Sequence, residues 1–290
     1  MKNAIEISGL GKQYSNFSLQ NIEFSVPQGS IVGFVGENGA GKTTTIKCIL
    51  DVVHKDSGSI LLFGEDNVLS GAKARAEIGV VFDECSFHDW LRAEQVGNIL
   101  KNVYLTWDEA LFKQLLERFG LAGLTKRKDI IKTYSRGMKM KLSLAAAMAH
   151  RPKLLILDEA TSGLDPVVRD EILDLFLEFI QDEEHSILFS SHITSDIEKA
   201  ADYLVFIHKG SIVLNAPKDE LLDQYGILHC NKENYAGLDK ALVVGSRASQ
   251  FGIDALVRNR HDASLKQEGI LLEKATIDDI MLFTIKGNTL

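Results

Sequence analysis

Short runs of apolar residues recur along the chain, and stretches with helical spacing separate them. Five runs are continuous enough to predict strands that are buried on both faces: 31–35, 78–82, 153–157, 186–190 and 202–207. Apolar positions three and four residues apart predict helices after Lys42 and over 167–180. Because strands and helices alternate, we predict an α/β fold with a mostly parallel sheet and helices on both of its faces.

Two other regions do not follow this alternation. Residues 4–8 and 19–26 alternate apolar and polar positions between turn signals, which predicts two further strands. Residues 94–119 and 137–149 have helical patterns and lie between two of the buried strands. Together they are too long for a simple crossover between parallel strands. We therefore expect an inserted helical subdomain over residues 85–150.

The pattern changes near the carboxyl end of the last buried strand. The stretch APKDELLDQYG, 216–226, has a proline, a short helical pattern and a terminating glycine, so we expect a domain boundary there. Beyond it we expect a strand at 241–245 and a final helix capped by Thr276, with two aspartates in its first turn. The chain is thus predicted to form a main domain over 1–215 and a small accessory α+β domain over 216–290.

Composition narrows the class of protein. The 290 residues are 45% hydrophobic and 25% charged, as in soluble globular proteins, and the net charge of −8 disfavours a nucleic-acid binder. The three cysteines are widely spaced and match no zinc pattern, which favours reduced thiols in a cytosolic protein. The first residues lack the apolar core of a secretion signal. The longest apolar run within a helical pattern, 142–149, is far shorter than the roughly 20 residues that span a bilayer, so work at a membrane would need a partner.

A glycine-rich sequence follows the first buried strand. GENGAGKT, which starts at Gly36, fits the pattern GxxxxGK[ST] between a predicted strand and a predicted helix. Gly36, Gly39 and Gly41 let backbone N–H groups turn toward a phosphate, and the N-terminus of the helix favours its charge. Lys42 would reach the β- and γ-phosphates of a nucleotide, and Thr43 would hold Mg²⁺. The less favoured alternative is a glycine-rich turn with a surface lysine.

A second polar sequence follows a later buried strand. In LLILDEA, 154–160, four apolar residues lead into the adjacent carboxylates of Asp158 and Glu159. Burial of two carboxylates is costly unless a cation or a proton compensates. Asp158 would contact Mg²⁺, mostly through water, and Glu159 would polarise the water that attacks a γ-phosphate. A solvated acidic pair at a strand end is the alternative, and the phosphate loop elsewhere in the chain makes it less favoured.

The segment that joins these motifs resembles a known family. YSRGMKMKLSLAAAMAHRPKLLILDEATSGLD, 134–165, is similar to the ATP-binding subunit of an ABC transporter, and the order of motifs agrees over 1–215. The resemblance implies a P-loop NTPase with a RecA-like core, an antiparallel β subdomain and an inserted helical subdomain, here with a small C-terminal α+β extension. It also implies that the protein binds and hydrolyses ATP with Mg²⁺.

The resemblance assigns roles to further residues. Tyr14 lies in the early loop where the family stacks an aromatic ring on adenine, and His192 ends a strand where the family's switch histidine contacts the γ-phosphate. Alternatively, Tyr14 is an ordinary aromatic residue of an edge strand, and His192 only caps the end of its strand. Ser135 and Gly137 stand at the family's signature position and head a predicted helix, whose N-terminus suits an anion. The nucleotide contacts implied for the phosphate loop are Gly36, Asn38, Gly39, Ala40, Gly41, Lys42, Thr43 and Thr44.

The chain departs from the family pattern in three places. Arg136 and Met138 replace a glycine and the glutamine of the signature LSGGQ, and Asp83 stands where the Q-loop glutamine is expected. An aspartate can hold Mg²⁺ or water but cannot donate as an amide does. Asp83 is therefore a candidate metal ligand or, alternatively, a loop residue that faces solvent. The third departure is that residues 216–290 exceed the minimal subunit.

The resemblance also implies partners. In the family, two subunits enclose two ATP molecules, and each signature closes the other subunit's phosphate loop, so we expect ATP-dependent pairing with a second copy or with a paralogous ATPase subunit. A transmembrane permease is expected to insert a coupling helix into a groove that involves Asp83–Trp90, which would hold the chain on the cytoplasmic face of the membrane. Phe87 and Trp90 would face this groove or, alternatively, pack inward.

An exporter of drugs or of amphipathic, antimicrobial peptides is the favoured function, and the permease rather than this chain selects the cargo. The alternatives are an importer ATPase and a soluble ABC ATPase that acts on ribosomes or DNA. The chain has one nucleotide domain, no heptad run and a net charge of −8, all of which argue against the soluble class. We therefore expect no nucleic-acid partner.

Overall fold

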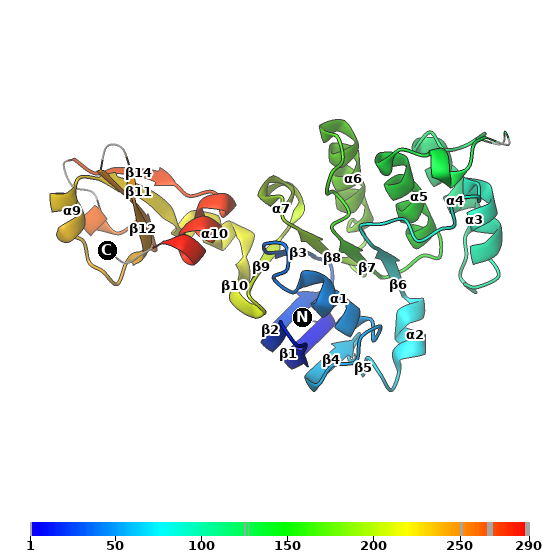
Figure 1. The fold of residues 1–290 in the computed structure, drawn as a ribbon, viewed down its shortest axis with the longest axis horizontal. Coiled ribbons are helices and arrows are strands. Elements are labelled where there is room, and N and C mark those ends of the chain that lie inside the picture. The colour runs from blue at the N-terminus through cyan, green and yellow to red at the C-terminus, as the bar shows by residue number, and fades with distance from the viewer. Residues whose placement is uncertain (1, 125, 127, 250–251, 266–268, 288–290) are drawn as a thin grey trace. The chain divides into compact units, whose positions relative to one another are not determined.

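The computed structural model describes residues 2–124, 126, 128–249, 252–265 and 269–287. Contacts between residues divide the chain into two compact units, Met1–Asn215 and Ala216–Leu290 (Figure 1). Residues 250–251 and 266–268 of the predicted accessory domain lie outside the described residues. Among the residues that are described, no helix is long and apolar enough to cross a bilayer.

The centre of the first unit is a six-stranded sheet with the strand order β10-β9-β3-β8-β7-β6. Its parallel strands are β3 (Ile31–Val35), β6 (Ile78–Val81), β7 (Leu154–Asp158), β8 (Ser186–Ser191) and β9 (Tyr203–His208). β10 (Ser211–Pro217) follows β9 after a two-residue turn in which Lys209 and Gly210 both have positive φ. The predicted parallel sheet is confirmed, whereas β10 was not predicted.

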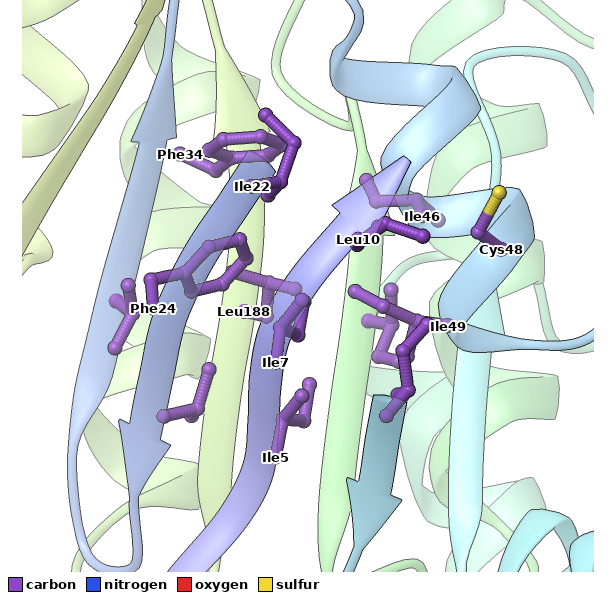
Figure 2. Packing of buried hydrophobic residues seen from close by; sticks show 14 of the residues in the cluster. Ile5, Ile7, Leu10, Ile22, Phe24, Phe34, Ile46, Cys48, Ile49 and Leu188 are labelled. Carbon is purple, nitrogen blue, oxygen red and sulfur yellow. The ribbon is translucent and has the colours of Figure 1, made fainter. Parts of the chain in front are cut away.

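A smaller antiparallel sheet packs against one face of this sheet. It consists, in the order β2-β1-β4-β5, of β1 (Asn3–Gln13), β2 (Ser18–Pro27), β4 (Ser57–Leu62) and β5 (Glu65–Asp66). Figure 2 shows the core between them, where Phe24 lies beside Phe34, with ring centroids 5.3 Å apart. Alternate residues of a strand face opposite ways, so Gly33 faces the other side, where an added Cβ would lie 2.8 Å from Ile197.

Eight helices complete the first unit as the structure describes it. They are α1 (Lys42–Ile49), α2 (Gly71–Ala76), α3 (Ala93–Leu100), α4 (Glu109–Arg118), the 3₁₀ helix η1 (Ile131–Thr133), α5 (Arg136–Met148), α6 (Pro166–Phe179) and α7 (Thr194–Ala200). Asp165 caps α6 by accepting a hydrogen bond from the N–H of Val168, and Pro166 occupies the first turn, where its missing N–H costs nothing.

The helical pattern predicted over 94–119 is interrupted in the structure. α3 ends at Leu100, and α4 begins only after Asp108, whose side chain accepts a hydrogen bond from the N–H of Leu111. The intervening residues include β-branched and aromatic side chains, which have low helix propensity. A strong N-cap after a poor helix-forming stretch therefore starts a second helix.

The second unit has an α+β fold. Its elements are α8 (Lys218–Gln224), β11 (Gly226–Cys230), α9 (Lys232–Ala236), β12 (Val243–Ser249), β13 (Gly252–Val257), the 3₁₀ helix η2 (Ala263–Leu265), β14 (Leu271–Lys274) and α10 (Ile277–Lys286). The strands form an antiparallel sheet in the order β12-β13-β11-β14. Thr276 caps α10 as expected, because its hydroxyl accepts from the N–H of Asp279 while its own N–H donates to the Asp279 carboxylate.

Candidate active site

The glycine-rich loop begins where β3 ends and leads directly into α1. Gly36 has no room for a side chain, because an added Cβ would lie 2.4 Å from the carbonyl oxygen of Ile207. Gly41 is the N-cap of α1 with a φ of 118°, and an added Cβ there would lie 2.9 Å from the ring of Phe17. Both glycines are therefore required by their surroundings, which hold the loop tightly between the sheet and the first helix.

Lys42 is buried at the start of α1, with 5% of its surface exposed. Its ammonium group donates hydrogen bonds to the carbonyl oxygens of Gly36, at 2.6 Å, and Glu37, at 3.3 Å. The same nitrogen lies 3.1 Å from Oε1 of Glu159. A buried ammonium group needs partners of this kind to offset its desolvation. The lysine of the phosphate loop is thus in contact with the second carboxylate of the later motif.

Asp158 and Glu159 lie at the end of β7 and are held by one residue of β8. Asp158 is 2% exposed and accepts a hydrogen bond of 2.6 Å from the hydroxyl of Ser190. The N–H of Glu159 donates to the carbonyl oxygen and to the hydroxyl of Ser190, at 3.2 and 3.0 Å. Glu159 has a φ of 54°, in the left-handed region. Such a backbone costs about 1–3 kcal/mol in a residue other than glycine, so the surroundings of Glu159 must offset this cost.

His192 follows β8 and contacts the same carboxylate. Its Nδ1 lies 2.6 Å from Oε2 of Glu159, whose side chain is 15% exposed. Glu159 therefore has a lysine at one oxygen and a histidine at the other. Because β3, β8 and β7 are adjacent parallel strands, their carboxyl ends bring these side chains to one edge of the sheet. We call Lys42, Asp158, Glu159 and His192 the carboxylate cluster.

The other loop residues predicted to bind nucleotide differ in exposure. Asn38, Gly39 and Thr43 are exposed, Thr44 is half-buried and Ala40 is buried. In the described part of the chain, none of their side chains makes a hydrogen bond or ion pair with the carboxylate cluster. Their roles stay predictions.

The predicted aromatic contact to adenine has a second candidate. Tyr14 is 41% exposed, and the Lys12 ammonium lies 5.8 Å from the centroid of its ring. Phe17, which the sequence analysis did not single out, packs against Gly41 and lines, together with Gly39, a hollow of about 500 Å³. Phe17 is thus in contact with the phosphate loop, whereas no described hydrogen bond or ion pair joins Tyr14 to it.

The signature-position residues lie at the start of α5. Ser135 is the N-cap, and its hydroxyl accepts a hydrogen bond of 3.2 Å from the N–H of Met138. Gly137 faces α6, where an added Cβ would lie 3.3 Å from Val168. Arg136 is exposed and covers Gly163, since an added Cβ on Gly163 would lie 3.0 Å from Nη1 of Arg136. No described hydrogen bond or ion pair joins Ser135 or Gly137 to the phosphate loop of the same chain.

Asp83 is exposed in the segment after β6. Residues of both charges surround it in a hollow of about 360 Å³, here called the charged hollow: Asp83, Glu84, Cys85, Tyr134, Arg136, Lys139, Met140 and Ser143. No hydrogen bond or ion pair between Asp83 and the carboxylate cluster is present in the described residues. Two of the three departures from the family pattern, Asp83 and Arg136, therefore line one hollow.

The segment expected to form the permease groove lies between β6 and α3. Phe87 is half-buried and lines a cavity of about 180 Å³ together with Tyr104 and His150. Trp90 is 68% exposed, and its ring stacks on that of His88 with centroids 4.6 Å apart. One of the two aromatic residues thus packs inward, and the other faces outward.

The oxygen donors of the phosphate loop and the carboxylate cluster meet the needs of a hard cation only in part. Thr43 and Asp158 offer the oxygen donors that Mg²⁺ prefers. No group of three or more histidine, cysteine, aspartate or glutamate side chains that could hold a metal ion is present among the described residues. A magnesium ion here would therefore depend on oxygens from nucleotide phosphates and water as well as on the protein.

The chain is similar to known proteins over most of its length. Residues 19–162 match the family described as "ABC transporter". The bacitracin transport ATP-binding protein BcrA of Bacillus licheniformis is 36% identical over 279 residues, which cover 93% of this chain and 85% of that protein. The lantibiotic transport ATP-binding protein SrtF of Streptococcus pyogenes is 34% identical over 216 residues, which cover 74% of this chain and 91% of that protein.

A solved structure described as the ATP binding subunit of an ABC transporter has a similar fold. It superimposes with a TM-score of 0.65 at 26% sequence identity, over 75% of this chain and 91% of that one. The fold expected from the sequence resemblance is thereby confirmed.

Proposed function

Because the chain belongs to the ABC transporter family, we propose that it is the ATPase subunit of an exporter for peptide-like or other amphipathic antimicrobial compounds. The cargo class is supported by relatives matched over most of their length, which are named for bacitracin and lantibiotic transport. The alignment with the bacitracin relative covers 93% of the chain and so extends into the second unit. The observation that carries the ATPase chemistry is the contact of Glu159 with both Lys42 and His192.

The phosphate loop would bind the β- and γ-phosphates through its backbone N–H groups and Lys42. In the structure the Lys42 ammonium is bonded to carbonyl oxygens of its own loop and to Glu159. Phosphate oxygens are stronger acceptors for an ammonium group than carbonyl oxygens, because the hydrogen bond is then charge-assisted on both sides. Lys42 would therefore exchange these partners for the nucleotide, with Gly36–Thr44 around the phosphates and Tyr14 or Phe17 beside the base.

Thr43 and Asp158 are the proposed ligands of Mg²⁺, which would neutralise charge on the phosphates when bound. The Ser190 hydroxyl fixes Asp158 by a hydrogen bond of 2.6 Å, so the carboxylate presents its other oxygen in a defined direction. Asp83 remains a candidate ligand from the sequence, and it alone of the three belongs neither to the phosphate loop nor to the carboxylate cluster.

Glu159 is the proposed base for the attacking water, and His192 the proposed contact to the γ-phosphate. Once Lys42 turns to the phosphates, Glu159 loses a cationic partner and its carboxylate becomes a better proton acceptor. The two hydrogen bonds from its backbone N–H to Ser190 fix the backbone that carries this carboxylate. When the γ-phosphate binds, His192 would leave Glu159 and contact the phosphate, so its position would depend on the bound nucleotide.

Ser135 and Gly137 would act on the nucleotide of a second subunit, either a second copy or a paralogue. They stand at the exposed start of α5, a helix of 13 residues whose N-terminus attracts an anion. A transmembrane permease would dock against the segment 83–90 and the exposed apolar residues near α3, among them Trp90 and Val103, at 68% and 66% exposure. The chain would then lie on the cytoplasmic face of the membrane, held there by the permease.

The test of the proposed function joins the chain to its membrane partner. A multi-span membrane protein encoded beside it would be co-expressed with the tagged chain in a host sensitive to bacitracin and lantibiotics. We expect co-purification of the two, ATP hydrolysis by the complex and raised resistance, which Glu159→Gln should abolish. An importer ATPase would co-purify but give no resistance, whereas an ATPase of the soluble class would not co-purify, and either result would contradict the proposal.

A further inference from the structure

Outside the carboxylate cluster but close to it in the chain, three buried polar atoms lack hydrogen-bond partners. They are Oγ1 of Thr161, Nε of Arg169 and Oδ2 of Asp196, as far as the structure describes the chain. Thr161 lies two residues after Glu159, Asp196 lies in the first turn of α7, which follows His192, and Arg169 of α6 pairs with Asp196. Native proteins leave few buried polar groups unpaired, and each such group needs an explanation.

Arg169 joins two segments that flank Glu159. From α6, its Nη2 donates a hydrogen bond of 3.4 Å to the carbonyl oxygen of Leu164, in the turn that follows Glu159. Its Nη1 lies 4.0 Å from Oδ1 of Asp196. Asp196 belongs to the first turn of α7, which begins just after His192, and its side chain is 2% exposed. The guanidinium group thus connects the turn 160–165 with the His192 segment.

The ion pair is incompletely formed in this structure. A separation of 4.0 Å exceeds the about 2.8 Å of a charge-assisted hydrogen bond, so the two groups can still approach each other. Burial raises the pKa of Asp196, and the Thr161 hydroxyl, Arg169 and His192 oppose this shift. Thr161 lies near the carboxylate without reaching hydrogen-bond geometry. A closer approach of Arg169 to Asp196 would draw the turn 160–165 and α7 together.

We propose that Arg169 and Asp196 are positioning residues for ATP hydrolysis, which set the turn 160–165 and the His192 segment in place around Glu159. The inference rests on the roles proposed above for Glu159 and His192. Neither positioning residue would touch ATP. Each would act through the backbone that carries Glu159 on one side and His192 on the other, so that loss of the link misplaces the base and the phosphate contact together.

The rival explanation is that the pair only packs α6 against α7. The chain offers a matched control, because Lys199 of α7 makes ion pairs with Asp170 and Asp174 of α6. This second link joins the same two helices at an exposed position, and its carboxylate partners both belong to α6. A residue that merely held the helices together should resemble Lys199 in its effect on turnover.

The test measures kcat and KM for ATP in the full-length chain with Asp196→Asn, Arg169→Met, both together, Arg169→Lys and Lys199→Met. We expect kcat to fall at least about tenfold in each single variant except Lys199→Met and Arg169→Lys, because small misplacements of catalytic groups have large effects. KM should change less than about twofold, since the phosphate loop is untouched. The double variant should fall no further than the single ones, because both residues act through one link.

Thermal unfolding midpoints identify variants that have lost their fold. If a single variant does not fold, the double variant Arg169→Met/Asp196→Asn still tests the proposal, because it removes both charges and leaves no unpaired buried ion. Glu159→Gln is measured in parallel. Wild-type turnover in Glu159→Gln would overturn the proposed site and this inference with it. An inactive Glu159→Gln together with wild-type kcat in the folded Asp196→Asn and double variants, or an equal loss in Lys199→Met, would overturn the positioning role alone.

Discussion

The carboxylate cluster and the charged hollow are both polar regions of the first unit, but they are built in opposite ways. In the cluster, Lys42 and Asp158 are 5% and 2% exposed, and each has a partner within 2.6 Å. In the charged hollow, Asp83 and Arg136 are exposed, and no described hydrogen bond or ion pair joins them. The charged groups of the cluster are therefore buried at a cost in desolvation, whereas those of the charged hollow stay solvated by water.

The difference explains where the chain keeps the family pattern and where it departs from it. Removing one partner from a buried charged pair costs about 3–5 kcal/mol, so few residue types are tolerated in the cluster. An exposed charge is worth about 0–1 kcal/mol, so substitution in the hollow is cheap in stability. Effects on activity should follow the same order, from large in the cluster to small in the hollow.

Lys42→Ala should have the largest effect on ATP hydrolysis. The substitution removes the one cation that the structure places inside the phosphate loop, and with it a charge-assisted contact to the phosphates. We expect turnover to fall at least about a hundredfold. Steady-state phosphate release measures it, with Lys47→Ala on the same helix as the control. Near-wild-type turnover in a folded Lys42→Ala variant would show that the phosphate loop is not part of the active site.

Glu159→Gln should stop hydrolysis while ATP binding persists. Glutamine has the shape of glutamate and can still hold water, but it cannot accept a proton as a base. The ATP-loaded pair of subunits should then accumulate. Size-exclusion chromatography with ATP and Mg²⁺ should show a larger species than without nucleotide. Glu65→Gln in the half-buried edge strand β5 serves as the control. Retained hydrolysis without a larger species would contradict the base role of Glu159.

The apolar runs of the sequence predicted the parallel sheet. The motifs of the sequence named Lys42, Asp158 and Glu159, which the structure brings together, and the family resemblance added His192. Continuous apolar runs and GxxxxGK[ST] are local signals, so Lys42 and Glu159 could be found without knowing that they touch. Ser190 could not be found in this way, because a serine in a strand carries no signal until the neighbouring strand is known. The same holds for Arg169 and Asp196, whose relation depends on how α6 packs against α7. Local sequence patterns do not reveal contacts between residues that are far apart in the chain and of common types.

Arg136→Gln should have a modest effect on ATP-dependent association. Arg136 is exposed at the signature position and covers Gly163, so it would face the second subunit together with Ser135. Loss of one exposed charge should weaken association about two- to fivefold and make it less sensitive to salt. Sedimentation of the Glu159→Gln background with ATP measures this, and Lys139→Gln in the same hollow is the control. An unchanged salt dependence would mean that Arg136 faces only solvent.

Asp83→Gln should have the smallest effect, and it restores the residue that the family pattern has at this position. If Asp83 lies near the metal, its carboxylate adds to the negative charge of Asp158 and Glu159, which repel one another unless a cation is present. ATP affinity should then depend on Mg²⁺ more steeply in the wild type than in Asp83→Gln, by no more than a few-fold because Asp83 is exposed. Titration of ATP affinity against Mg²⁺ measures the difference. Glu84 lines the same charged hollow, so Glu84→Gln separates a metal contact from a general loss of negative charge.

A shallower curve in Asp83→Gln alone would make Asp83 part of the metal site. Identical curves would leave it as a residue of the charged hollow, balanced there by Arg136 and Lys139.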